Sequence, residues 1–260
     1  MTTPATSQGL LFGTVAESYE RFRLGYPDQV VDRTLAYAGR TVEAAVEVGA
    51  GTGKATRAFT SRGVSVTALE PDPGMHGVLL RETAGMQVEP LLRSLEEYDG
   101  PRVGLVYAAA AWHWTDPATR YRDVAAMLTD GGVLAVFGAP MRVADEGVQT
   151  AIAAVTAATL DGPLDDPAFS PPSAVSWDTG PTWLDRELRE TPLFTDVRLH
   201  VLPRVVVLPQ RELVGYLSTL SAFLALPAEA RQLLLARVVE VLPDQVAVDL
   251  TVGLHLARRA

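Results

Sequence analysis

The first absence that matters in this 260-residue chain is cysteine, of which it has none. Disulfides, thiolate metal sites and cysteine nucleophiles are therefore excluded together. The chain also lacks asparagine, and Lys54 and Ile152 are its only lysine and isoleucine. Because asparagine, lysine and isoleucine all need A-rich or AT-rich codons, this composition is typical of a gene from a very GC-rich bacterium.

Positive charge and long apolar runs are also scarce. There are 22 basic against 31 acidic residues, which gives a net charge of -9. That balance opposes general affinity for nucleic acid or anionic membranes. No apolar run approaches the roughly 20 residues that span a bilayer, and residues 1–7 lack the basic and apolar parts of a secretory signal. We therefore expect a cytoplasmic protein with neither nucleic-acid nor membrane partners.

A glycine motif is the most informative feature that the chain does contain. Behind the apolar run 42–46, the acid Glu47 is followed by three glycines at alternate positions, namely Gly49, Gly51 and Gly53. Glycine lets a loop adopt backbone angles closed to other residues and lie directly against a ligand. A second apolar run, 64–69, ends in Glu70, whose carboxylate can accept both ribose hydroxyls. A strand, a glycine-rich turn, a helix and a second strand ending in an acid are typical of a nucleotide-binding sheet.

The spacing of the glycines separates two classes of cofactor. A dinucleotide fingerprint would need a third glycine at position 54. That position is Lys54, and the third glycine is Gly53. The shift argues against a pyrophosphate-bearing cofactor and favours S-adenosylmethionine.

Short apolar strands alternate with helical segments through the first half of the chain. Strands are expected at 44–48, 64–69, 87–91, 103–109 and 133–137, and helices at 54–62, 73–83 and 117–128. This alternation predicts an α/β fold, with a mostly parallel sheet covered by helices on both faces. After residue 140 the rhythm changes. We expect helical insertions at 141–190 and 209–242 to cap the ligand edge, and 191–208 and 243–260 to supply the last strands of the core sheet.

Five segments spread over nearly the whole chain carry a family resemblance. They are Phe12 to Pro27, Glu47 to Gly53, Glu70-Pro71-Asp72 with Met75, Ala110 to Asp116, and Leu128 to Gly132. Together they resemble class I S-adenosylmethionine-dependent methyltransferases, and more narrowly the trans-aconitate-methyltransferase-like and UbiE-like group. The resemblance implies a Rossmann-like fold with a mostly parallel seven-stranded sheet. It makes 1–40 the N-terminal helices and 41–140 the cofactor-binding core.

The resemblance also implies a set of cofactor contacts. Glu47 would orient the methionine ammonium, Glu70 would accept the ribose hydroxyls, and Arg23 would bind the methionine carboxylate. The other expected cofactor-binding residues are Tyr19, Gly49, Ala50, Gly51, Gly53, Pro71, Met75, Ser94, Leu95, Ala109 and Ala110. The chain departs from the family at two places: Leu24 stands where the family often has proline, and Ser94-Leu95 where it usually has an Asp-Ala pair.

His113 is the candidate catalytic base, because a histidine titrates near working pH. The alternative is that it packs between Trp112 and Trp114 and only shapes the pocket. The expected substrate-pocket residues are Trp112, Trp114, Trp177 and Trp183. No cluster of histidine, aspartate and glutamate has metal-ligand spacing, so no metal is expected.

These features predict a methyltransferase acting on a small organic acceptor, in bacterial specialised metabolism, as a monomer or a homodimer. Two alternatives stay open at the level of sequence. One is an enzyme that retains the cofactor but catalyses a non-methylating reaction such as a cyclisation. The other is a regulatory binding module on the same fold.

Overall fold

A seven-stranded sheet forms the centre of the computed structural model, which describes residues 12–171 and 183–260. The strand order is β3-β2-β1-β4-β5-β10-β7, and β10 runs antiparallel to both of its neighbours while the other pairs are parallel. The strands are β1 (Ala44–Val48), β2 (Ser65–Leu69), β3 (Val88–Leu91), β4 (Val103–Ala109), β5 (Leu128–Gly138), β7 (Phe194–Leu202) and β10 (Val252–Arg259). This arrangement confirms the predicted Rossmann-like class I methyltransferase fold.

Helices cover both faces of this sheet because successive strand residues point to opposite sides. In β4, Leu105 and Tyr107 join the apolar cluster that contains residues of α3 (Asp28–Ala38) and α4 (Lys54–Thr60). Val106 and Ala108 join the opposite cluster, beside α6 (Arg120–Met127) and α8 (Trp183–Glu190). The sheet is therefore buried on both sides.

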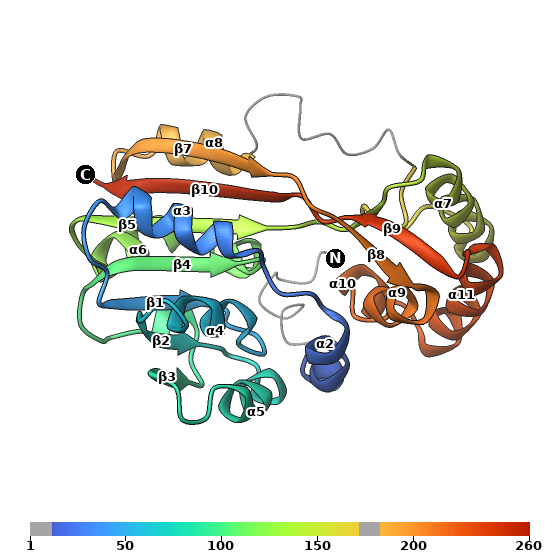
Figure 1. The fold of residues 1–260 in the computed structure, drawn as a ribbon, viewed down its shortest axis with the longest axis horizontal. Coiled ribbons are helices and arrows are strands. Elements are labelled where there is room, and N and C mark those ends of the chain that lie inside the picture. The colour runs from blue at the N-terminus through green and yellow to red at the C-terminus, as the bar shows by residue number, and fades with distance from the viewer. Residues whose placement is uncertain (1–11, 172–182) are drawn as a thin grey trace.

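A second group of elements forms a cap beside the seven-stranded sheet (Figure 1). The cap has an apolar core of its own. A three-stranded sheet of order β6-β9-β8 lies beside the cap helices. Its strands are β6 (Arg142–Val143), β8 (Val205–Pro209) and β9 (Gln245–Asp249), and the helices are α7 (Glu146–Leu160), α9 (Gln210–Leu217), α10 (Ser221–Leu224) and α11 (Ala228–Val241). The cap is thus a mixed unit, whereas the sequence pattern predicted helices alone.

Two chain segments connect the core sheet to the cap. The sequence suggested one strand across each of 191–208 and 243–260 in the core sheet, but each segment holds two strands that belong to different sheets. β7 ends at Leu202, and the chain continues through Pro203 and Arg204 into β8. β9 and β10 are separated at Leu250 and Thr251, and the Leu250 amide donates to the Arg204 carbonyl at 2.8 Å across the gap. The pair β7–β10 in the core sheet and the pair β8–β9 in the cap sheet therefore form one two-stranded ribbon from core to cap.

The other helical elements lie near the carboxyl ends of the parallel strands. They are η1 (Phe12–Val15), α2 (Ala16–Phe22), α5 (Pro73–Glu82), η2 (Leu95–Glu97) and η3 (Trp112–Trp114). Helix α6 begins at Arg120, three residues later than the sequence suggested. Asp116 accepts a hydrogen bond from the Ala118 amide at 2.8 Å, and this local turn delays the helix.

Candidate functional site

The loop between β1 and α4 carries three glycines with left-handed backbone angles, φ being +65° at Gly49, +59° at Gly51 and +87° at Gly53. A Cβ on Gly49 would lie 2.5 Å from the Cβ of Ala111, and a Cβ on Gly53 would lie 2.8 Å from Leu79 Cδ1. These two glycines therefore allow the loop to pack closely. No atom lies within 4 Å of the corresponding position at Gly51, so its missing side chain leaves open space in front of the loop.

Glu70, at the end of β2, is tied to this loop. Its carboxylate accepts hydrogen bonds from the backbone amides of Gly51 at 2.7 Å and of Asp72 at 2.8 Å. Burial raises the pKa of Glu70 to about 7 despite these two bonds. The loop and the acid therefore form one preorganised unit, and each carboxylate oxygen has lone-pair capacity left for a ligand hydroxyl.

Asp72 is a site residue to which the sequence analysis assigned no role. It caps α5 by accepting from the amides of Gly74 at 2.7 Å and Met75 at 3.1 Å. Its other oxygen accepts from the Gly13 amide at 3.1 Å, which fixes the N-terminal segment over α5. The sequence does contain a signal for this helix N-cap, because aspartate followed by proline is typical of a helix N-terminus.

Glu47 is fully buried in β1. Its Oε2 accepts from Thr56 Oγ1 at 2.5 Å and from the Tyr107 hydroxyl at 3.0 Å. Its Oε1 has no hydrogen-bond partner within the described part of the chain. The pKa of Glu47 is raised to about 8, because the effect of burial exceeds the lowering by the two hydrogen bonds. An unbonded buried carboxylate oxygen is costly unless a ligand donates to it.

Two adjoining cavities bring together most of the predicted cofactor residues. The larger, of about 270 Å³, is lined by Tyr19, Gly49, Gly51, Glu70, Pro71, Met75, Ser94, Leu95, Ala109 and Ala110, among others. The smaller, of about 70 Å³, includes Arg23, Glu47 and Ala50 in its wall. Gly53 lines neither of these two cavities and instead caps α4.

Ala110 lies where these cavities meet a third. It has a φ of +54°, a left-handed angle uncommon for a residue with a side chain. Its amide donates to the Phe137 carbonyl at 2.8 Å, which holds the chain in this conformation as it leaves β4. Such strain is often stored at functional sites.

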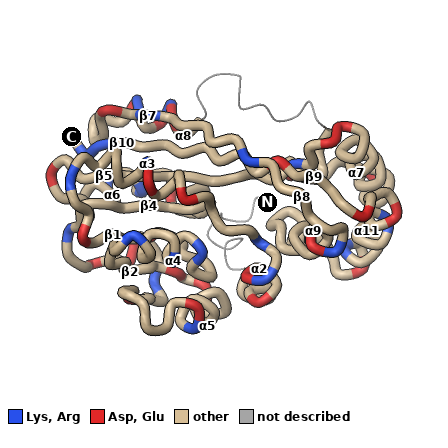
Figure 2. The backbone as a smooth tube through the Cα atoms, viewed as in Figure 1, with Lys and Arg blue, Asp and Glu red and all other residues tan. Residues whose placement is uncertain are grey.

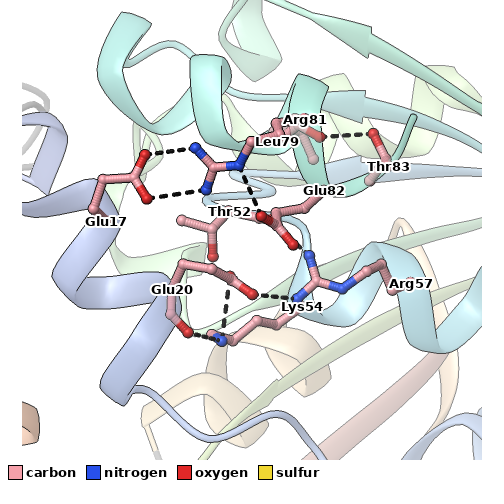
Figure 3. A network of polar contacts seen from close by, with 9 residues as sticks. All are labelled: Glu17, Glu20, Thr52, Lys54, Arg57, Leu79, Arg81, Glu82 and Thr83. Atoms are coloured by element: carbon pink, nitrogen blue, oxygen red, sulfur yellow. Dashed lines mark hydrogen bonds and ion pairs between the residues drawn. The ribbon is translucent and has the colours of Figure 1, made fainter.

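A network of charged side chains fastens α2 to the core (Figure 3). Glu17 pairs with both terminal nitrogens of Arg81, at 2.6 and 3.0 Å. Glu20 contacts Arg57 at 2.7 Å and Lys54 at 3.2 Å, and Lys54 also donates to the Glu20 carbonyl. These contacts position α2 so that Tyr19 lines all three cavities.

Arg23, just after α2, reaches the cap. Its Nε donates to Thr219 Oγ1 at 2.8 Å, its Nη1 to the Tyr216 hydroxyl at 3.0 Å, and its Nη2 to the Thr219 carbonyl at 3.0 Å. The sequence predicted that Arg23 binds the methionine carboxylate, and that role stays a prediction. In this structure Arg23 joins α2 to the cap and lines both the 70 Å³ cavity and the third cavity, described next.

The third cavity, of about 520 Å³, lies between the core, α2 and the cap, and we call it the acceptor cavity. His113, Trp112, Trp114 and Trp183 are in its wall. Trp112 is only 2 % exposed and packs into the core, whereas Trp183 is 49 % exposed. Trp177 lies outside the described residues.

Asp166 and His255 also line the acceptor cavity, although the sequence analysis proposed neither. Asp166 follows α7, and His255 stands among leucines on β10, in a strand pattern that gives little hint of a site. Burial lowers the pKa of His255 to about 4. Burial also lowers the pKa of His113, and the charge of Arg120 acts in the same direction. Both imidazoles are therefore neutral at neutral pH.

Residues of both charge signs are mixed along the described chain. Figure 2 shows acidic and basic residues interspersed along the core and the cap. Within the described residues, no helix is long and apolar enough to cross a membrane. The same residues contain no group of three or more histidine, cysteine, aspartate or glutamate side chains placed to hold a metal.

Comparisons with known proteins agree with this geometry. Residues 46–136, which contain the glycine loop and Glu70, match the methyltransferase domain family. An uncharacterized methyltransferase of Mycobacterium tuberculosis is 40 % identical over 136 residues, covering 52 % of this chain and 54 % of that protein. The chain thus spans about half the length of these curated relatives.

Solved structures share the fold over most of the chain. A protein of Anaeromyxobacter dehalogenans named for a type II methyltransferase has a TM-score of 0.60 at 20 % identity, covering 91 % of this chain and 98 % of that one. A Haemonchus contortus phosphoethanolamine N-methyltransferase, solved with S-adenosylhomocysteine, has a TM-score of 0.52 at 15 % identity, covering 95 % and 57 %. These matches show a methyltransferase domain over residues 46–136 and the fold of the class I S-adenosylmethionine-dependent methyltransferases.

Proposed function

We propose that this protein transfers a methyl group from S-adenosylmethionine to a small organic acceptor in bacterial specialised metabolism. The observation that carries the proposal is the unit formed by Gly51, Glu70 and Glu47. It joins an open glycine loop, a ribose-binding acid and a buried acid that has one unbonded oxygen.

The residues present fit the cofactor. Glu47 Oε1 is a buried acceptor without a partner in the described structure, as an ammonium group requires. Glu70 would bind the ribose, and Met75 and Leu95 would pack on the adenine from the wall of the 270 Å³ cavity. When bound, S-adenosylmethionine supplies a methyl group on a positively charged sulfur.

This chain's own contribution is orientation and proton transfer. We call the 270 Å³ cavity the cofactor cavity. It shares Ala110 and Trp114 with the acceptor cavity, so ligands bound in the two cavities would meet at these residues. Alignment of two reactants supplies much of the rate enhancement in such transfers. His113 lines the acceptor cavity and is neutral, so its imidazole can accept a proton from an acceptor hydroxyl or amine.

The charge distribution supports a small acceptor rather than a nucleic acid. The net charge is -9, and basic residues are mixed with acidic ones along the described backbone (Figure 2). A nucleic-acid substrate would favour a continuous basic groove.

Calorimetric titration with S-adenosylmethionine, S-adenosylhomocysteine and NADH tests the proposal. We expect micromolar affinity for both adenosyl compounds and no binding of NADH. Folded protein, free of retained ligand, that binds neither adenosyl compound would contradict it. Binding without methyl transfer to any acceptor would favour the non-methylating alternative.

A further inference from the structure

The walls of the acceptor cavity carry information on the acceptor itself, provided that the proposed function holds. Six residues in the described part of the wall are Phe, Tyr or Trp. They are Phe12, Tyr19, Trp112, Trp114, Phe137 and Trp183. A volume of about 520 Å³ is within the usual range for small-molecule sites. Rings of this kind favour offset stacking or edge contacts with a planar ligand.

Positive charge on the ligand is disfavoured, because several of these rings already meet the protein's own cations. The Arg120 guanidinium lies 5.5 Å from the ring centre of Trp112 and 5.0 Å from that of Trp183. Arg23 lies 5.2 Å from the ring centre of Tyr19. A cationic ligand stacked on the same rings would lie close to a like charge, which offsets its attraction to the rings.

Negative charge on the ligand has no good partner either. The guanidinium of Arg23 already donates from all three nitrogens to the cap, and Arg120 is paired with Glu187 behind the wall. Asp166 is the acidic residue of the described lining. It would repel an anion, and its interaction with the Arg23 guanidinium in the same wall offsets its attraction for a cationic ligand. His113 and His255 are neutral, so they add no positive charge.

From these rings and charges we infer that the acceptor cavity takes an uncharged, planar aromatic compound. Trp114 and Trp183 supply its stacking surfaces. Trp114 lines both the cofactor cavity and the acceptor cavity, so a compound stacked there lies at the junction. Trp183 is half exposed at the start of α8 and lines the acceptor cavity without reaching the cofactor cavity.

Equilibrium dialysis at pH 7, with the protein saturated by S-adenosylhomocysteine, tests this assignment with four matched probes. They are 2-naphthol, 2-naphthoate, 2-naphthylmethylammonium and decahydro-2-naphthol. The first is uncharged and planar, the next two carry opposite charges, and the last is uncharged but not planar. We expect 2-naphthol to bind at least about tenfold more tightly than each of the others.

A variant locates the site. Trp183→Leu removes a ring from the wall and should weaken 2-naphthol binding about tenfold. Leu233→Ala changes a similarly exposed apolar side chain on α11, outside the lining of the cavity, and should leave binding unchanged. Both variants should bind S-adenosylhomocysteine like the parent protein.

The outcomes separate this inference from the proposed function. Absence of S-adenosylhomocysteine binding would count against the proposed function. With that binding intact, tighter binding of either charged probe, equal binding of the saturated probe, or no binding of 2-naphthol would overturn the inference alone.

Discussion

The core and the cap contribute to the site in different ways. In the core, the two cavities assigned to the cofactor are lined by the glycine loop and two buried acids, Glu47 and Glu70. In the cap and at its border, the cavity is walled by whole side chains such as Trp183 and Leu220. A backbone-built site needs glycine at fixed spacing, whereas a wall of side chains can be assembled from many sequences. This difference explains why the family match covers residues 46–136 of the core, whereas no motif marks the cap.

Gly51→Val is expected to have the largest effect on the core. The new side chain would occupy the open space before the loop, so S-adenosylhomocysteine should bind at least about 100-fold more weakly by calorimetry. Gly63→Val is the matched control, because Gly63 also has a left-handed φ, of +81°, and open surroundings. Equal loss of affinity in both variants would show that backbone strain, and not occupied space, is responsible.

His113→Gln tests the border between core and cap. If His113 accepts the acceptor's proton, turnover should fall by about 100-fold, while affinity for S-adenosylhomocysteine stays within about threefold. Burial lowers the pKa of His113, so wild-type turnover should fall only as pH drops below the usual histidine range. The variant should lack this dependence. A few-fold change with an unaltered pH profile would indicate that His113 only shapes the wall.

Leu213→Ala perturbs the cap from within. Leu213 is fully buried in the apolar core of the cap, so truncation should lower the free energy of unfolding by about 2–5 kcal/mol in denaturant titrations. Affinity for S-adenosylhomocysteine should change little under conditions where the variant is folded. A parallel loss of cofactor affinity would show that the core site depends on the packing of the cap.

Glu47→Gln should have opposite effects on ligand binding and on stability. The pKa of Glu47 is raised to about 8, so the folded protein binds more protons than the unfolded chain between about pH 4.5 and 8. The contribution of Glu47 to the stability of the ligand-free protein should therefore fall as the pH rises from about 4.5 to 8. Glutamine carries no such charge, so the fall between pH 5 and 8 should shrink by about 1 kcal/mol or more.

The same substitution should weaken binding of S-adenosylhomocysteine, because the ammonium loses a carboxylate partner. Denaturant unfolding at pH 5 and 8, with the exposed Glu43→Gln as control, measures the first effect and calorimetry the second. An unchanged pH dependence in Glu47→Gln would mean that Glu47 stays ionised in the ligand-free protein.

Glu17→Gln should give the smallest effect. Its ion pair with Arg81 joins α2 to α5 (Figure 3), but both side chains are more than half exposed. Such pairs contribute about 0–1 kcal/mol, and the unfolding free energy should change by no more than that. A larger loss, insensitive to added salt, would show that the N-terminal helix is held mainly at this point.

Sequence patterns predicted the core better than the cap, for physical reasons. Strands β1, β2 and β4 are buried on both faces, so each gives a nearly continuous apolar run in the sequence. These runs predicted the ends of the three strands to within one residue. The cofactor assignments of individual residues remain predictions, although the structure gathers most of them around two cavities.

The cap sheet could not be predicted in this way. β6 has only two residues, and the apolar alternation runs on through the bends at Pro203 and Leu250 with no change of period. The pairing of β8 with β9 depends on where those bends occur. His255 and Asp166 come to the acceptor cavity from segments about 90 residues apart, a proximity that only the folded chain provides.

The ribbon that links the two sheets has a consequence for how such a chain can be altered. Arg204 and Leu250 are joined by a backbone hydrogen bond, so the stretch between them leaves and returns at one place. Its length can then change while β7 and β10 keep their register. This stretch carries β8, α9, α10, α11 and β9 but neither β6 nor α7, so one part of the cap is a single excursion of the chain, and it brings Leu220 and Ser221 to the wall of the acceptor cavity.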